Sequence, residues 1–151
     1  MRRLIISSTN RSNARDTHIS DYYITPIDKI IEFLQEFEKS ENIFKQNPYI
    51  IDPCGGGDEY HPMSYPEAIK MLYSNTDYKI FTIDIREDSL AEFKGDYLKT
   101  EIPTKPDIII TNPPFNQAID IIKKAIGDVK DNGYVIMLLR LNFFGSKERF
   151  P

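Results

Sequence analysis

Three short segments of this chain carry residue types that do chemistry in proteins, and each follows or ends an apolar run. They are the glycine loop Pro53-Cys54-Gly55-Gly56-Gly57-Asp58, the carboxylate Asp84, and the turn Asn112-Pro113-Pro114-Phe115. Three successive glycines let the backbone turn sharply and let a ligand approach closely, because no Cβ stands in the way. A flexible turn between a strand and a helix is the structural alternative for this loop.

The glycine loop lacks the patterns that bind a pyrophosphate, since neither G-x-G-x-x-G nor G-K-[ST] occurs in the chain. The sequence therefore favours a cofactor without a pyrophosphate. An acid that ends the second strand of a nucleotide-binding sheet accepts hydrogen bonds from a ribose diol, and Asp84 has that position. A solvated strand end is the structural alternative for Asp84.

The Asn-Pro-Pro-Phe turn is stiff, because two prolines fix φ and remove two backbone donors. The residues that precede the prolines are driven out of the helical region. Such a turn exposes the Asn112 amide and the Pro113 carbonyl as preset acceptors, with the flat face of Phe115 beside them. This combination predicts a pocket for a planar group that carries an NH₂, and a purely structural turn is the alternative.

Strands and helices are expected to alternate along the chain. Apolar runs predict strands at residues 49–52, 79–84, 107–111 and 134–139. Amphipathic patterns predict one helix at 26–39, a second that begins with the capping box Ser64-Tyr65-Pro66-Glu67 and runs through Leu72, and a third at 116–126 that Gly127 ends. A helical turn is predicted at 89–93. Thr25 is predicted to cap the first helix, with Pro26 at its first position. The pattern predicts an α/β fold with a doubly wound, mostly parallel sheet, whose ligands bind beyond the carboxyl ends of the strands.

The length of 151 residues indicates one domain, with an irregular N-terminal segment at 1–20 followed by the core at 21–151. The arginines in the first segment form either a solvated tail or an arm that contacts phosphates, and they are Arg2, Arg3, Arg11 and Arg15. A net charge of −4 argues against non-specific nucleic-acid binding but leaves a local site open. The single cysteine excludes a disulfide framework, and no apolar run is long enough for a membrane span, which indicates a cytosolic protein.

Four elements in order resemble the S-adenosylmethionine-dependent amino-methyltransferases, and in particular phage-type DNA adenine-N6 methyltransferases. The elements are Asp21-Tyr22-Tyr23-Ile24-Thr25-Pro26, the segment from Asp52 through the glycine loop, Gly95-Asp96-Tyr97-Leu98, and the Asn-Pro-Pro-Phe turn. The resemblance covers residues 21–145. The order of the elements, without a long insertion before the Asn-Pro-Pro-Phe turn, is that of the subgroup whose target-recognition region lies C-terminal to the catalytic core.

The resemblance implies a role for each matching residue. It implies cofactor contacts from Tyr23, Thr25, Pro26, Asp52, Pro53, Cys54, Gly55, Gly57, Asp84, Ile85, Asp96, Tyr97 and Asn112. Thr25 and Pro26 would contact the methionine end of S-adenosylmethionine, and Asp96 would accept a hydrogen bond from the adenine amine. Asp84 would hold the ribose hydroxyls, and Tyr97 would pack nearby.

The resemblance also implies the reaction and its catalytic residues, which are Asn112, Pro113, Pro114 and Phe115. An adenine flipped from the DNA duplex would stack on Phe115. Asn112 and the Pro113 carbonyl would accept hydrogen bonds from its amine, which aims the nitrogen lone pair at the sulfonium methyl group. Transfer would be a direct in-line displacement that depends on orientation and electrostatics.

Family members continue past the fourth predicted strand with a closing hairpin and a recognition region, whereas this sequence stops at Pro151, just after an element at 138–145 that resembles the sixth of the family. We therefore expect a core without that hairpin: a fragment, a truncated gene, or a core completed by another chain. DNA binding would be weak, and an open edge of the last strand would invite self-association or a completing chain.

Competing functions remain open at this point. Cys54 resembles the nucleophile of cytosine-C5 methyltransferases, but its place inside the glycine loop favours a small buried residue. His18 and His61 lack partners at ligand spacing, so we expect no metal. The same cofactor with an RNA base or a protein glutamine as acceptor is one alternative, and a non-catalytic remnant that binds the cofactor or a partner chain is another. The expected location is the cytoplasm of a bacterial or phage-infected cell.

Overall fold

The structure, a computed structural model, describes residues 2–9 and 23–140. One sheet of six strands runs through these residues in the order β1-β6-β5-β2-β3-β4. The strands are β1 (Arg3–Thr9), β2 (Tyr49–Asp52), β3 (Lys79–Asp84), β4 (Phe93–Lys94), β5 (Ile108–Thr111) and β6 (Tyr134–Arg140). Every pair of neighbours is parallel. From β2 the chain builds outward through β3 and β4, then returns to the other side of β2 to form β5 and β6.

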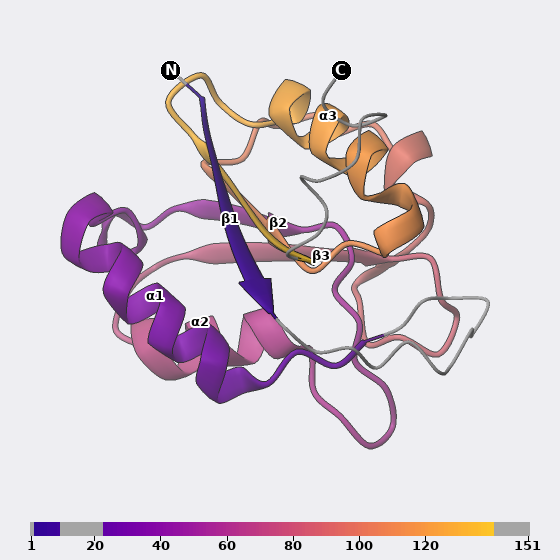
Figure 1. The fold of residues 1–151 in the computed structure, drawn as a ribbon, viewed down its shortest axis with the longest axis horizontal. Helices are drawn as coiled ribbons and strands as arrows, with labels where there is room; N and C mark the ends of the chain where they lie inside the picture. The colour runs from indigo at the N-terminus through magenta and orange to yellow at the C-terminus, as the bar shows by residue number, and fades with distance from the viewer. Residues whose placement is uncertain (1, 10–22, 141–151) are drawn as a thin grey trace.

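Helices cover both faces of this sheet (Figure 1). The helices α1 (Ile27–Glu41) and α2 (Ser64–Tyr73) lie on one face, and α3 (Ala118–Asp128) lies on the other. Short 3₁₀ turns complete the described elements, namely η1 (Phe44–Gln46), η2 (Tyr97–Lys99) and η3 (Phe115–Gln117). The predicted α/β fold with a parallel sheet is therefore confirmed, and its arrangement is compatible with a Rossmann-like fold.

The isoleucine runs explain why the central strands are buried on both faces. Ile108 and Ile110 pack in the core under α1 and α2, whereas Ile109, which lies between them, packs in the core under α3. All three side chains are fully buried. Successive side chains of a strand point to opposite faces, so an uninterrupted apolar run is what a sheet covered on both sides requires.

Two local predictions are wrong. Residues 89–93 form no helical turn, because their backbone N–H groups are used elsewhere: Leu90 donates to the Gly56 carbonyl at 3.1 Å and Glu92 to Thr82 Oγ1 at 2.9 Å. The chain then pairs as β4 with the end of β3. Gly127 does not end α3, which continues to Asp128.

The predicted caps are also absent. Ser64 is the first helical residue of α2 rather than its cap, and the preceding residue, Met63, makes no side-chain cap hydrogen bond. At α1 the N-cap position belongs to Pro26, which has no side-chain donor or acceptor to offer. Thr25 is free of the helix end and makes a tertiary contact instead, which is described below.

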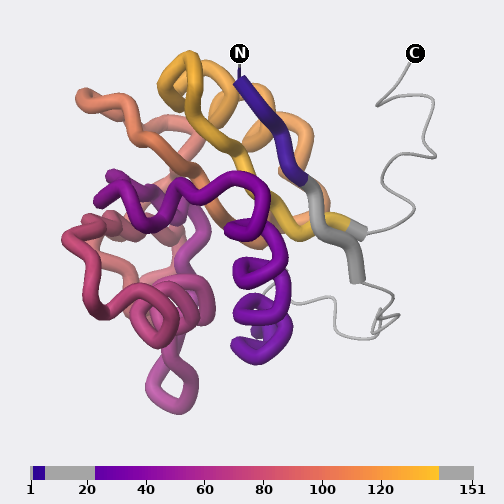
Figure 2. Tube along the Cα trace, turned by 90° about the vertical axis from the view of Figure 1, so that its left-hand side faces the viewer, coloured from indigo at the N-terminus to yellow at the C-terminus, as the bar shows by residue number. Residues whose placement is uncertain are grey.

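The N-terminal segment contains a strand where the sequence predicts irregular structure. Residues Arg3–Thr9 pair in parallel with all seven residues of β6, and Figure 2 shows the two segments side by side. This pairing covers the outer side of β6, so the open edge expected at the last strand is filled by the chain itself. The remainder of the irregular prediction, at 10–20, lies outside the described residues, as do Arg11, Arg15 and most of the 138–145 element.

Ion pairs hold β1 in place. Arg3 Nη1 lies 2.9 Å from Glu41 Oε2 at the end of α1, and the Tyr134 hydroxyl donates to the same oxygen at 2.7 Å. That hydrogen bond raises the pKa of Tyr134. Arg2 pairs with Asp131 at 2.9 Å. These two arginines therefore act as structural contacts within the chain. In the part of the chain that the structure describes, no helix is long and apolar enough to cross a membrane.

We predict that Glu41→Ala destabilises the fold by about 1 kcal/mol, because it removes one acceptor shared by Arg3 and Tyr134. The matched control is Glu36→Ala, which breaks an exposed pair with Lys39 on the same helix and should cost less than about 0.5 kcal/mol. Urea denaturation of both variants measures the difference. Equal losses for the two would show that the Glu41 contact does not hold β1.

Candidate functional site

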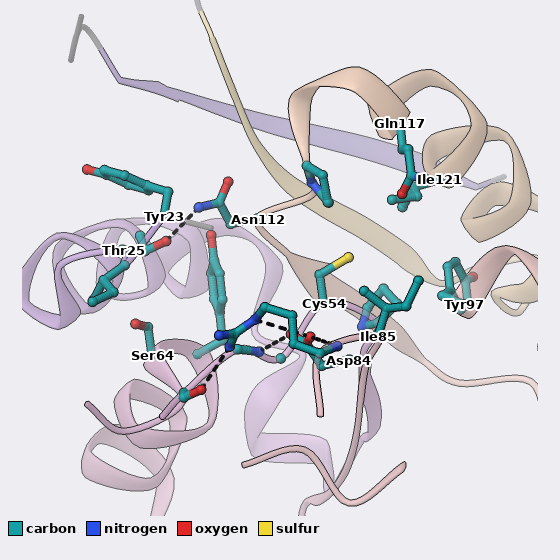
Figure 3. A pocket seen from close by; sticks show the side chains of 18 of the residues that line it. Tyr23, Thr25, Cys54, Ser64, Asp84, Ile85, Tyr97, Asn112, Gln117 and Ile121 are labelled. Atoms are coloured by element: carbon teal, nitrogen blue, oxygen red, sulfur yellow. Dashed lines mark hydrogen bonds and ion pairs between the residues drawn. The ribbon is translucent and has the colours of Figure 1, made fainter. Parts of the chain in front are cut away.

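A pocket of about 760 Å³, a volume that includes its open mouth, lies beyond the carboxyl ends of β2, β3 and β5. The pocket forms where the strand order reverses between β2 and β5, because the loops that follow these strands diverge there. Side chains from α3 and from the segment before α1 close its sides (Figure 3).

Most of the residues predicted from the sequence line this pocket. They are Tyr23, Thr25, Pro53, Cys54, Gly55, Gly57, Asp84, Ile85, Asp96, Tyr97, Asn112 and Pro114. Four predicted residues do not line it, namely Pro26, Asp52, Pro113 and Phe115. The predicted segments therefore meet at one pocket, and each of the four exceptions has its own surroundings.

The glycine loop is fixed to β3 by backbone hydrogen bonds. Gly55 N donates to the Ile83 carbonyl at 2.8 Å, and Gly56 N donates to Asp84 Oδ2 at 2.8 Å. Gly56 and Gly57 both have positive φ, 69° and 74°, a conformation that other residues rarely adopt. A Cβ on Gly57 would also lie 2.9 Å from Met63 Cγ. The glycines are thus needed by the turn and by contacts within the chain, in addition to any ligand.

Asp84 is buried at the end of β3, and both of its carboxylate oxygens are hydrogen bonded. Oδ2 accepts from Gly56 N, while Oδ1 accepts from Arg86 N at 2.8 Å and lies 3.5 Å from Arg86 Nε. A carboxylate has about four lone-pair sites, so Asp84 retains capacity for a ligand hydroxyl. Its orientation is already set by the protein.

Asp96 and Tyr97 form another side of the pocket. Asp96 Oδ1 caps η2 by accepting from Leu98 N at 3.0 Å. The Tyr97 hydroxyl donates to Asp128 Oδ2 on α3 at 2.7 Å, and Lys124 Nζ lies 4.8 Å from the centre of the Tyr97 ring. Burial, together with Asp128, raises the pKa of Tyr97. Tyr97 therefore lines the pocket with its ring while its hydroxyl is used by α3.

The Asn112 amide is oriented by Thr25. Asn112 Nδ2 donates to Thr25 Oγ1 at 3.0 Å, a contact drawn as a dashed line in Figure 3. One of the two amide N–H groups is used in this way, and the amide oxygen remains available to accept a hydrogen bond. The contact joins the segment before α1 to the loop after β5 and explains why Thr25 is not a helix cap.

The two other predicted residues of this turn, Pro113 and Phe115, are not among the residues that line the pocket. Pro113 is buried, and Phe115 is half-buried at the start of η3. Pro114 has an extended backbone, with φ −55° and ψ 133°, and η3 then turns the chain toward α3. The Phe115 ring does not line this pocket, so its expected place beside the amide stays a prediction.

Asp52 lies below the pocket rather than in its wall. It is fully buried, and its Oδ1 accepts from Thr111 Oγ1 at 2.6 Å and from Cys54 N at 3.2 Å. Among the described residues no donor reaches Asp52 Oδ2. Burial raises the pKa of Asp52 to about 7. The carboxyl links the ends of β2 and β5.

The described residues include one cysteine and one histidine, Cys54 and His61. Cys54 lines the pocket and is half-buried, and burial raises the pKa of its thiol, so it stays protonated near neutral pH. His61 Nδ1 lies 2.9 Å from Asp58 Oδ1. Within residues 2–9 and 23–140 no cluster of three or more metal-ligating side chains occurs, and His18 lies outside these residues.

Eight residues that line the pocket were not predicted as site residues. Three of them, Ile24, Gly56 and Gly95, lie within the predicted segments, and the other five lie outside them: Ser64, Tyr65, Arg86, Gln117 and Ile121. Two signals were available. Ser64 and Tyr65 open the helix that directly follows the glycine loop, and Gln117 and Ile121 are four residues apart, on one side of a helix start. Arg86 had no such signal, because its role depends on contacts across two loops.

Comparisons with known proteins add no assignment to this geometry. No family model matches the chain, and no solved structure matches it.

We predict that Asp52 makes the stability of the fold pH-dependent. Its pKa is about 7 in the folded state and 3.8 as the ordinary value, so the folded chain holds a proton that the unfolded chain releases. The contribution of this proton to the free energy of unfolding is complete below pH 4 and is lost as the pH rises through 7. Between pH 4 and pH 8, the free energy of unfolding of Asp52→Asn should therefore rise by at least about 1 kcal/mol relative to that of the original chain.

Denaturation curves at several pH values measure this effect, and Asp77→Asn, at an exposed position, is the control. Parallel pH profiles for the original chain and Asp52→Asn would contradict the assignment of a proton to Asp52.

Proposed function

We propose that this chain is the catalytic core of an S-adenosylmethionine-dependent DNA adenine-N6 methyltransferase of the Rossmann-like type. The observation that carries the proposal is Asn112, a pocket residue whose amide nitrogen donates to Thr25, which leaves the amide oxygen as an acceptor. An amide acceptor fixed beside a small-molecule pocket suits a reaction at a substrate amine. The four sequence elements that resemble the family supply the identity of that amine.

The chemistry of the pocket is consistent with a nucleoside-like methyl donor. Ile85 is 60% exposed at the pocket and offers an apolar surface to a flat ring. Asp96 supplies an acceptor for a ring amine, and Asp84 supplies one for a ribose hydroxyl. The glycine loop, fixed to β3, provides a close backbone surface without a pyrophosphate pattern. These residues would hold the donor, which supplies an electrophilic methyl group on a sulfonium.

Asn112 would accept a hydrogen bond from the target amine and, with the Pro113 carbonyl, turn the nitrogen lone pair toward the methyl group. The bound donor would supply the methyl group for a direct displacement at this amine. The acceptor oxygens of Asn112 and Pro113 would hold the amine hydrogens, and the surplus proton would pass to water. Such a displacement needs no protein nucleophile, which agrees with the protonated thiol of Cys54. Orientation and preset acceptors are the main contributions of the protein. For Phe115, stacking on the flipped adenine is supported by the sequence resemblance alone.

The first test is transfer of a tritiated methyl group to duplex DNA, to transfer RNA and to a glutamine-containing peptide. We expect label in duplex DNA only, because the element that precedes the glycine loop resembles that of DNA methyltransferases. Label that enters only RNA or peptide would replace the DNA substrate with one of these acceptors. Binding of S-adenosylhomocysteine without transfer to any acceptor would favour a non-catalytic remnant.

The second test is Asn112→Ala, which we expect to lower transfer at least about a hundredfold, the usual effect of removing a preset polar contact to the reacting group. Affinity for S-adenosylhomocysteine, measured by calorimetry, should stay within a few-fold. Asn116→Ala is the matched control, because Asn116 is exposed in the same turn and does not line the pocket. Full transfer by Asn112→Ala would refute the role of this amide.

A further inference from the structure

Arg86 is a pocket residue that the proposed function leaves without a role. Its side chain is 12% exposed although it carries a full charge. Arg86 Nη2 donates to the Gly57 carbonyl at 2.8 Å, and Nε lies 3.5 Å from Asp84 Oδ1. The backbone N–H of Arg86 donates to that same carboxylate oxygen at 2.8 Å. The guanidinium therefore spans the space between the glycine loop and the carboxylate at the end of β3.

This bridge is part of a set of contacts that joins two loops. Gly56 N donates to Asp84 Oδ2 at 2.8 Å, and Leu90 N donates to the Gly56 carbonyl at 3.1 Å. Arg86 adds a charged side chain that reaches the second positive-φ glycine, Gly57. The loop after β2 and the loop after β3 are thereby held as one unit, with Arg86 between them.

The reason for such a bridge lies in the conformational freedom of glycine. Two consecutive glycines lose more backbone entropy on ordering than any other pair of residues. If the loop were loose before binding, a ligand would have to order it, and affinity would fall by that cost. A guanidinium can hold a carbonyl and a carboxylate at once because its donors form a planar fork, whereas a lysine ammonium is a single compact charge.

We propose that Arg86 is a positioning residue of the ligand site: its guanidinium holds the Gly57 carbonyl and the Asp84 carboxylate in the arrangement that the methyl donor requires. The identity of the ligand rests on the proposed function, whereas the hold on the glycine loop does not. Asp88 gives a matched control, since it pairs with Arg86 Nη1 at 3.3 Å but its side chain is 72% exposed and does not line the pocket.

The ligand half of the proposal is tested by calorimetry with sinefungin on the full chain. We expect Arg86→Lys and Arg86→Ala to bind about tenfold more weakly, the loss expected for one hydrogen bond that involves a charged group, and Asp88→Asn to stay within about twofold. In steady-state assays the KM for S-adenosylmethionine should rise by a similar factor with a smaller change in kcat. A merely structural role would instead lower the fraction of active protein and leave KM unchanged.

The loop half is tested without ligand by amide hydrogen exchange. We expect Arg86→Lys to speed exchange at Gly56 and Leu90, whose N–H groups bond within the two loops, and to leave Val135 in β6 unchanged. Arg86→Lys keeps the side-chain stem and charge, so it remains informative if Arg86→Ala fails to fold.

The outcomes separate the two proposals. Absence of sinefungin binding by the original chain would count against the proposed function, while exchange would still decide whether Arg86 holds the loops. Normal binding by the original chain with equal affinity in Arg86→Lys would overturn the positioning role, whether or not exchange had changed. Unchanged exchange at Gly56 and Leu90 would overturn the hold on the loop.

Discussion

Parallel strands bring their carboxyl ends to one edge of a sheet, and in this sheet the chain changes its direction of travel between β2 and β5. The loops that follow these two strands must therefore separate, and the pocket lies between them. A buried hydrogen bond of 2.6 Å from Thr111 to Asp52 joins the two strand ends directly beneath this opening. The candidate functional groups described above are positioned by this separation of the loops after β2 and β5.

The sequence predicts the central elements well because their physical signals are strong and local. Short apolar runs mark β2, β3, β5 and β6, and helical spacing marks α1, with its buried stripe of Ile30, Leu34 and Phe37. These sequence signals are weak for strands that are held mainly by pairing with a neighbouring strand. The strand β1 has only a short apolar centre between polar residues, and β4 has two exposed residues that pair with the end of β3. Only the folded sheet supplies the partners that order these edges.

The site shows the same division between local and long-range information. Glycines after β2, a carboxylate at the end of β3 and an amide after β5 could be recognised because each has a distinctive residue type at a strand end. The hydrogen-bond partners of these residues could not be recognised, because they come from distant segments. Thr25 pairs with Asn112, and Arg86 pairs with Gly57. Two of the residues expected in the site do not line the pocket: the Asp52 carboxyl bonds to Thr111 within the sheet, and Phe115 begins η3.

The account centres on one claim, that the space between these loops receives a nucleoside-like methyl donor next to the Asn112 amide. A crystal structure of the chain with bound sinefungin tests it most directly. The claim predicts a ligand whose ring lies against Ile85, whose ribose reaches Asp84, and whose amine that replaces the methyl group lies toward Asn112. An empty pocket at saturating sinefungin, or a ligand bound elsewhere on the chain, would contradict it.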